Sequence, residues 1–380
     1  MGFKKAILVL LLLIILTMGA ASAADTNTTS DNLAANEDTN LELSENDNIL
    51  SVESNDIISD PGNGSYTPGN GSIVTGRTFS DLNTLIQNAG SELNLSENYT
   101  YTDGDPTSIT IDKQITINGN GITIDGKGAS RAFEINFNNV VLNNINFINC
   151  NNINGGAIYW NGAQGTISNC KFTNNTASEN GGAVYFVKEY TGRVISCNFT
   201  NNTVNYNGRG GAIYFGHNGN VTNCNFTNNK VRSNEYINTE GGAVFIWDYG
   251  EVTNCKFADN SASQGGAIYI LSGGDVTNCN FTNNTAIYNG RGGAVYFSGT
   301  GTVTNCNFTD NKANSRGGAV CSDSICNITN CNFTNNTATQ GGAIYIWNSG
   351  TVTNCNFINC SAELGKAIYA STNTIVSNCN

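Results

Sequence analysis

The chain has 380 residues, of which only 12% are charged, with 17 Lys plus Arg against 29 Asp plus Glu. The formal charge of −12 argues against nucleic acid and anionic membranes as partners, because both are bound by clustered Lys and Arg. The single histidine, His217, excludes His-rich metal sites and leaves one candidate for any His-dependent catalytic triad.

The first 23 residues are typical of a secretory signal peptide. Two lysines precede an apolar run over residues 6–18, and Ala21-Ser22-Ala23 supplies a small-residue cleavage site. We expect this segment to be removed on secretion, while an uncleaved membrane anchor is the alternative. Residues 24–76 are rich in Asp, Asn, Ser, Thr and Glu and bury too little apolar area to fold, so they are expected to form a disordered acidic spacer.

Residues 77–90 are predicted to form a short capping helix. Their apolar side chains have helical spacing behind a Thr78 or Ser80 cap, and a helix here would cover the open edge of the first coil that follows. Residues 91–380 are predicted to be β structure throughout. Early strands are expected at residues 114–117, 121–125 and 140–142.

A five-residue block repeats along residues 155–369. The block Gly155-Gly156-Ala157-Ile158-Tyr159 returns every 24–31 residues, at Gly181, Gly210, Gly241, Gly265, Gly292, Gly317, Gly341 and, in degenerate form, Gly365. A period of this length with β-branched and aromatic positions, glycine turns and no helical periodicity predicts a parallel β-helix, one coil per repeat. Equivalent residues of coils about 4.8 Å apart would then form columns along the axis.

A second block, with an Asn-Cys-x-Phe core, lies between the glycine blocks and predicts two inward columns. The cysteines of the first column are Cys170, Cys197, Cys224, Cys255, Cys279, Cys306, Cys331 and Cys355, with Cys379 as a ninth. The phenylalanines of the second are Phe172, Phe199, Phe226, Phe257, Phe281, Phe308, Phe333 and Phe357. The Asn three residues after each Phe is expected at a bend, where its side-chain amide can form hydrogen bonds with the coils on both sides.

The alternation of GGA[IV] with F-x-x-N, as in Phe172-Thr173-Asn174-Asn175, resembles the chlamydial polymorphic membrane protein repeat. The fuller unit GGAIY…VTNCNFTNNTA, behind a signal peptide and an acidic spacer, resembles adhesin-like surface proteins of methanogenic archaea. The resemblance covers about residues 77–380. It implies a right-handed, pectin-lyase-like β-helix displayed outside the cell, and it says little about activity because that superfamily includes lyases, hydrolases and inert adhesins.

Alternation along the glycine-block strands predicts an outward aromatic column. If the Ile158 side of the strand faces the core, the opposite side presents Tyr159, Tyr185, Tyr214, Phe245, Tyr269, Tyr296, Tyr345 and Tyr369. Such a ribbon can stack sugar rings or anchor a protein. The invariant Ala157 position on the same side favours the opposite interpretation, an interior column, and both stay open.

Three coils are lengthened at one corner, where the insertions present Tyr and Arg side chains typical of recognition sites: Tyr206, Arg209, Tyr236, Tyr288 and Arg291. Tolerated surface variation is the alternative interpretation. Sequons are dense, as at Asn174, Asn198, Asn225 and Asn280, and outward ones are candidate glycosylation sites.

No catalytic constellation stands out. Asp259 and Asp310 share a column about 10 Å apart, near the upper limit for an inverting glycosidase, yet Asp replacing Asn in a bend is the simpler interpretation. Asp103-Gly104-Asp105 is read as a turn rather than a Ca²⁺ ligand set. The cysteine column predicts buried free thiols, with disulfides between neighbouring coils as the alternative. No metal and no cofactor is expected.

The sequence therefore predicts a secreted cell-surface protein, adhesin-like and without catalysis, whose partner is a polysaccharide or protein of another cell. A carbohydrate-active β-helix enzyme and a passive envelope scaffold are the alternatives. We expect no integral membrane segment. The last coil has no capping helix, so either it self-associates or the chain is a shortened member of its family.

Overall fold

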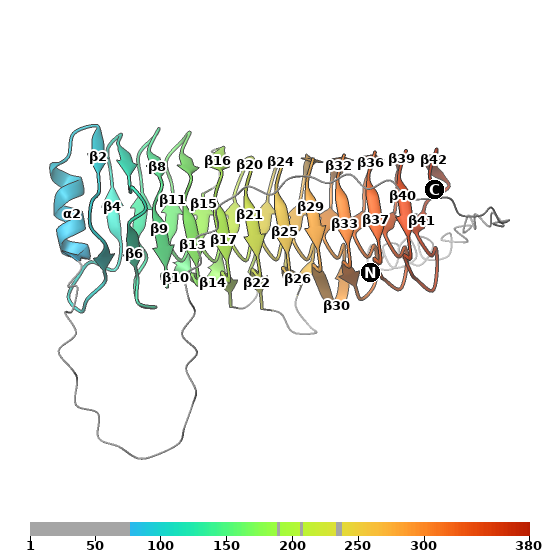
Figure 1. Cartoon of the computed structure of the whole chain (residues 1–380), viewed down its shortest axis with the longest axis horizontal. Coiled ribbons are helices and arrows are strands. Elements are labelled where there is room, and N and C mark those ends of the chain that lie inside the picture. The colour runs from blue at the N-terminus through green and yellow to red at the C-terminus, as the bar shows by residue number, and fades with distance from the viewer. Residues whose placement is uncertain (1–76, 188–190, 206–207, 233–237) are drawn as a thin grey trace, which may run out of the picture. The chain divides into compact units, whose positions relative to one another are not determined.

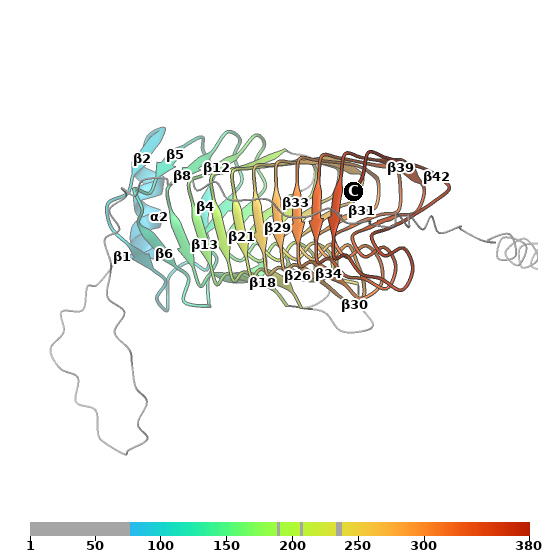
Figure 2. The same ribbon diagram turned by 45° about the vertical axis from the view of Figure 1, so that its right-hand side comes forward.

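The computed structural model describes residues 77–187, 191–205, 208–232 and 238–380. The predicted signal peptide and spacer, 1–76, lie outside these residues. The described chain is a right-handed parallel β-helix in which equivalent strands of successive coils pair in register, as predicted (Figure 1). Four parallel sheets run along its axis, and the turned view shows their strands stacked coil upon coil (Figure 2).

The Phe sheet has 12 strands, and those from residue 146 onward carry the phenylalanine column on their inner side. They are β1 Arg77–Thr78, β3 Tyr99–Thr100, β6 Thr123–Asp125, β9 Asn146–Ile148, β13 Lys171–Thr173, β17 Asn198–Thr200, β21 Asn225–Thr227, β25 Lys256–Ala258, β29 Asn280–Thr282, β33 Asn307–Thr309, β37 Asn332–Thr334 and β40 Asn356–Ile358.

The Tyr sheet has 11 strands, most of which follow a glycine block. They are β4 Ile109–Ile111, β7 Phe133–Ile135, β11 Ile158–Trp160, β15 Val184–Phe186, β19 Ile213–Phe215, β23 Val244–Ile246, β27 Ile268–Ile270, β31 Val295–Phe297, β35 Val320–Ser322, β38 Ile344–Ile346 and β41 Ile368–Ala370.

The Val sheet has 12 strands that precede the cysteine column. They are β2 Glu92–Asn94, β5 Thr116–Asn118, β8 Val141–Asn143, β12 Thr166–Ser168, β16 Gly192–Ile195, β20 Gly219–Thr222, β24 Tyr249–Thr253, β28 Gly273–Thr277, β32 Thr300–Thr304, β36 Cys326–Thr329, β39 Ser349–Thr353 and β42 Asn373–Ser377.

A fourth sheet of seven strands lies between the Phe and Tyr sheets in the middle coils. Its strands are β10 Asn151–Asn154, β14 Thr176–Asn180, β18 Thr203–Val204, β22 Lys230–Val231, β26 Ser261–Gln264, β30 Thr285–Arg291 and β34 Lys312–Ala313. The small side chains Ala177, Val204, Val231 and Ala262 form a separate buried cluster beneath this sheet.

Asparagines turn each coil twice. Asn278, before Cys279, and Asn283, after the Phe281 strand, both have left-handed backbone, with φ of 55° and 54°. Equivalent positions of the other repeats are Asn in nearly every coil, because Asn adopts this conformation more readily than other non-glycine residues. Asp259 and Asp310 occupy the second of these corners, with φ of 59° and 57°, which confirms their interpretation as bend residues.

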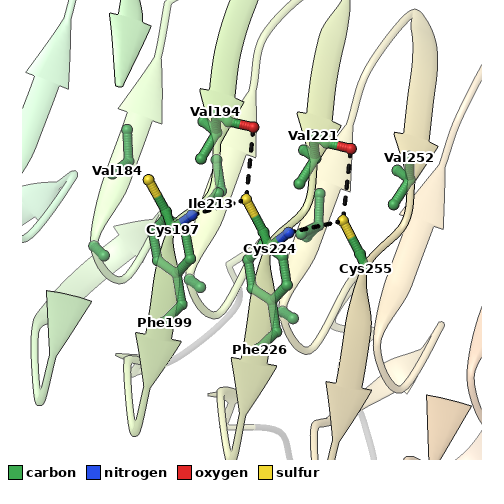
Figure 3. Packing of buried hydrophobic residues seen from close by; sticks show 14 of the residues in the cluster. Val184, Val194, Cys197, Phe199, Ile213, Val221, Cys224, Phe226, Val252 and Cys255 are labelled. Carbon is green, nitrogen blue, oxygen red and sulfur yellow. Dashed lines mark hydrogen bonds between the residues drawn. The ribbon is translucent and has the colours of Figure 1, made fainter. Parts of the chain in front are cut away.

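The cysteine and phenylalanine columns fill the core, as predicted (Figure 3). Phenylalanine rings of successive coils stack with centroids 4.7–5.0 Å apart. Each cysteine also satisfies a backbone group at the corner. The amide of Cys197 donates to the Sγ of Cys224 at 3.3 Å, and that thiol contacts the carbonyl of Val194 at 3.6 Å. The sulfur thus takes the place of the backbone carbonyl that would accept this amide in a continuous strand.

A buried asparagine ladder performs the same task at the next corner. Asn175, Asn202, Asn229, Asn260, Asn284, Asn311 and Asn336 are fully buried. The Oδ1 of Asn284 accepts the backbone N–H and the side-chain amide of Asn260, while its Nδ2 donates to Phe257 and Asn311. The predicted amide ladder is confirmed. Cys150 and Cys360 stand at its two ends, where each replaces an Asn.

The N-terminal helix α2, Phe79–Asn88, covers the first coil as predicted, with Phe79, Leu82 and Ile86 buried against it. Thr78 is the N-cap and exchanges hydrogen bonds with Asp81. Asp105, the last residue of the Asp103-Gly104-Asp105 turn, also caps this helix, because its carboxylate accepts from the backbone N–H groups of Phe79 and Ser80 at 3.3 and 3.0 Å.

Asp105 makes the stability of this cap dependent on pH. Partial burial alone would raise the pKa of its carboxyl, but hydrogen bonds from Ser80 and Thr102 lower that pKa to about 2. A carboxyl whose pKa lies below the value of about 4 for the unfolded chain stabilises the fold above pH 4 and loses this contribution as pH falls toward 2. We expect Asp105→Asn to raise hydrogen exchange of the α2 amides at pH 7, at a cost of about 1 kcal/mol. The exchange of the variant should then change less between pH 4 and 2 than that of the wild type, and an equal change in both would contradict this role.

Candidate functional site along the Tyr sheet

The aromatic column lies on the outer side of the Tyr sheet, as the strand alternation predicts. The Ile and Val side chains of the same strands are fully buried in the core, and the aromatic rings form a separate cluster opposite them. Rings of successive coils stack with centroids 4.7–5.4 Å apart. The outward orientation of the column is therefore confirmed.

The expectation that this column is an open ribbon is wrong for its central members. Tyr214, Phe245, Tyr269, Tyr296 and Tyr345 are at most 7% exposed, whereas Tyr159, Tyr185 and Tyr369 are half-buried. Rings stacked at the coil spacing cover one another's faces, and the guanidinium groups of three arginines lie over rings of the column: Arg131, Arg209 and Arg316. Alternation along one strand fixes the side that a residue faces, but not what covers it.

The Ala position explains why the alternation was ambiguous. Ala157 and its equivalents belong to the core cluster, not to the aromatic side. The strand begins only at Ile158, and the carbonyl of Ala157 accepts the amides of both Ala132 and Phe133, as at a bend. The two-residue period therefore starts after the alanine, and the placement of Ala157 and Tyr159 on one side is corrected.

The aromatic column is interrupted at Cys321, where a polar group replaces the ring. Asp323 accepts a hydrogen bond from the hydroxyl of Tyr296 and pairs with Arg291 at 3.4 Å. Burial and the hydrogen bond to Asp323 raise the pKa of Tyr296. The phenol stays protonated at neutral pH and is held as a donor.

The corner insertions are only partly described. Tyr206 and Tyr236 lie outside the described residues. Arg209 forms an ion pair with Glu240 and Arg291 pairs with Asp323, so both are engaged within the chain, while Tyr288 is 43% exposed. The side chains of Arg209 and Arg291 keep about a third or more of their area exposed as well, so all three described members are partly accessible.

Two tryptophans that the sequence analysis did not single out lie beside the column. Trp247 follows Phe245 by two residues and Trp347 follows Tyr345 by two, at the end of the Tyr-sheet strand. Arg209 stacks over Phe245 and Trp247, and Arg316 stacks over Tyr345 and Trp347, with distances from Cζ to ring centroid of 4.9–5.6 Å. The repeated pattern, aromatic–Ile–Trp one coil after Arg-Gly-Gly, was the available signal.

Carboxylates on the Val sheet form the other polar cluster. Glu251 and Asp275 are paired in register on adjacent strands, and the hydroxyl of Tyr249 donates to Asp275 at 2.5 Å. This hydrogen bond, together with partial burial, raises the pKa of Tyr249 to about 12. His217 lies 3.4 Å from Asp248 nearby. Within the described ranges, no three His, Cys, Asp or Glu side chains converge to hold a metal ion.

All thirteen cysteines are free thiols, and eleven are buried. Burial raises the pKa of Cys150 and of Cys326 to about 12, so these two thiols stay protonated at pH 8 and react slowly. Native protein treated with iodoacetamide at pH 8 should be labelled first at Cys360 and Cys379, the two half-buried thiols, and at all thirteen after denaturation. Mass spectrometry without reduction checks this, and unlabelled cysteines in the denatured chain would establish disulfides instead.

Comparisons with known proteins agree with this architecture. Residues 230–380 match the family model described as a right handed beta helix region, and residues 169–187 and 196–216 match the Chlamydia polymorphic membrane protein repeat. Neither the curated proteins nor the solved structures yield a match. In the described part of the chain, no helix is long and apolar enough to cross a membrane. The chain is a β-helix repeat protein whose repeats resemble those of a surface protein family.

Proposed function

We propose that this protein is secreted, is displayed at the cell surface and works as an adhesin, without catalysis. The observation that carries the proposal is that outward-facing side chains of the sheets repeat in register from coil to coil. On the Phe sheet, for example, the side-chain amide of Asn225 donates to Asn198 at 2.8 Å, and the amides of Asn307 and Asn332 donate to Asn280 and Asn307 at 2.9 Å. A rigid surface that presents equivalent groups on every coil suits multivalent contact, in which weak contacts combine into strong attachment.

The match to a polymorphic membrane protein repeat supports surface display, and the signal-peptide pattern of residues 1–23 supports secretion. The partner would be a polysaccharide or protein of another cell. Exposed sequon residues, such as Asn225 and Asn280, are the proposed glycosylation positions. The last described coil exposes Ile358, Leu364, Ile375 and Val376, which supports the prediction of self-association there.

A polysaccharide-cleaving enzyme is the second candidate, and one observation favours it. Glu251 and Asp275 lie directly opposite each other on adjacent strands, with backbones about 4.8 Å apart. Retaining glycosidases use two carboxyl groups about 5 Å apart, and two acidic side chains that project from neighbouring registered positions are candidates for such a pair. The sequence analysis considered Asp259 and Asp310 instead, which are separated by the coil of Asn283.

One experiment separates the candidates. The mature chain, labelled with a fluorophore, is incubated with whole cells and a polysaccharide panel, and retention and newly released reducing ends are measured together. Saturable retention that unlabelled chain competes away, without released ends, is the expected result. Released ends that disappear in Glu251→Gln and Asp275→Asn would establish the enzyme. The absence of both retention and released ends would favour a passive envelope scaffold and would overturn the adhesin.

A further inference from the structure

The two Arg–Trp clusters beside the aromatic column share one construction. In the first, Arg209 precedes a glycine block, and Phe245 and Trp247 lie on the next coil. In the second, Arg316 stands in the equivalent position, with Tyr345 and Trp347 on the next coil. The clusters therefore provide an internal comparison, because the same backbone carries different neighbours around each.

The first cluster is closed by its own chain. Glu240, on the coil after Arg209 and paired with it in register, supplies the carboxylate of an ion pair. Leu271, on the coil after Trp247, packs against the same cluster of rings as Trp247. The guanidinium thus has its counterion, and the tryptophan belongs to an aromatic cluster that an apolar side chain of the next coil extends.

The second cluster is open at both corresponding places. Gln340 occupies the position of Glu240, and no carboxylate of the described residues forms an ion pair with Arg316. The guanidinium also donates no hydrogen bond to any residue in the described ranges, which leaves its five N–H groups for a ligand. Ser371 occupies the position of Leu271, and Trp347 is 50% exposed.

A half-exposed indole, beside a guanidinium that has no ion-pair partner among the described residues, defines the chemistry of the occupant. A flat apolar surface on the ligand would stack on Trp347, and a carboxylate would take two parallel hydrogen bonds from Arg316. The hydroxyl of Ser371 donates to the carbonyl of Asn348 and lies 3.4 Å from the hydroxyl of Thr374, so its oxygen is left to accept from a ligand hydroxyl. These requirements together describe the ring of an acidic sugar, with a C–H face, a carboxylate and hydroxyl groups.

An extended acidic peptide fits less well. Peptides of that kind are usually captured by main-chain hydrogen bonds at a free strand edge. The strand that carries Tyr345, β38, is paired on both sides, with β35 and β41, so its backbone offers no free edge. Only side chains are available for contact, which favours a saccharide.

We propose that Arg316, Trp347 and the adjoining Ser371 form a binding site for acidic saccharides of the uronate type, the polysaccharide contact of the adhesin proposed above. The biological role of this site depends on the proposed adhesin function, whereas the chemistry of its ligand does not. Residues 77–380 hold 15 basic and 19 acidic side chains, so no general attraction for anions supports binding and the contact has to be local.

The test measures binding of trigalacturonate to the full mature chain by titration calorimetry, with maltotriose as a neutral probe and triaspartate as a peptide probe. We expect trigalacturonate to bind at least tenfold more tightly than either, and binding to weaken as salt increases. Arg316→Gln and Trp347→Ala should each weaken it at least tenfold. Phe137→Ala, which removes another exposed aromatic ring far from both carboxylate and Arg–Trp clusters in the chain, is the matched control and should leave binding unchanged.

Two reciprocal variants keep the test independent of folding defects. Gln340→Glu with Ser371→Leu copies the closed cluster into the open one and should abolish binding while the chain remains folded. Glu240→Gln with Leu271→Ser opens the first cluster and should add a second site. Triaspartate binding as tight as trigalacturonate would indicate a peptide site, and trigalacturonate binding that is absent or is unchanged by Arg316→Gln would overturn the proposal.

The whole-cell assay distinguishes failure of this inference from failure of the adhesin. Cell retention without trigalacturonate binding would reject the saccharide site and keep the adhesin. Trigalacturonate binding that Arg316→Gln abolishes, without cell retention, would keep the site and reject adhesion as its purpose.

Discussion

Asn284→Leu should destabilise the β-helix by about 4 kcal/mol or more, although it replaces a polar side chain in the core with an apolar one of similar size. The change removes the acceptor of the Asn260 backbone N–H and the donor to the Phe257 carbonyl, two backbone groups at a fully buried corner. Each buried group left without a partner costs about 1–3 kcal/mol, and the lost amide bonds to Asn260 and Asn311 add to this.

Denaturant unfolding of the variant and of a matched control measures the effect. Asn280→Ser lies four residues away, at the other end of the Phe281 strand, but its side chain is exposed. We expect it to change the free energy of unfolding by less than about 0.5 kcal/mol. Because each coil contacts only its neighbours, hydrogen exchange in Asn284→Leu should rise first in the coils around residue 284. Equal stability of both variants would show that the ladder adds nothing beyond filling space.

The fold could be predicted because its determinants repeat in the sequence. The cysteine and phenylalanine columns follow from the period alone, since residues such as Phe281 and Phe308 pair in register once coils stack. The positions of the left-handed corners could also be predicted, because Asn recurs where a short strand has to turn. Why cysteine recurs was not predicted, since its role as acceptor of the Cys amide one coil earlier needs the corner geometry.

The candidate site could be predicted only in part, because its properties arise between coils. Outward orientation of the Tyr345 ring follows from strand alternation, but its cover by Arg316 comes from a residue one coil earlier. The open state of Trp347 likewise depends on Ser371, 24 residues further along the chain. A pattern read along one strand contains neither neighbour, so it suggested eight accessible rings where five are buried.

Gly266→Ala should be among the most damaging single methyl additions to this chain, with a loss of about 3 kcal/mol or more. Gly266 is the second glycine of its block, and its φ is not in the left-handed region. The requirement for glycine is therefore one of space. A Cβ here would overlap the carbonyl oxygen of Gly293 on the next coil and lie 2.7 Å from the backbone of Thr285. Both neighbours are main-chain atoms in paired strands or their corners, so no side chain can turn away to make room.

Two comparisons separate this effect from the general cost of replacing glycine. Gly90→Ala meets nothing within 4 Å and should leave the free energy of unfolding unchanged or slightly raise it. The chain itself places Lys366 at the equivalent position of the last described coil, where no further described coil packs over it. If Gly266→Ala unfolds at the same denaturant concentration as the wild type, the coil spacing can expand, and close backbone approach is not the reason that the second glycine recurs.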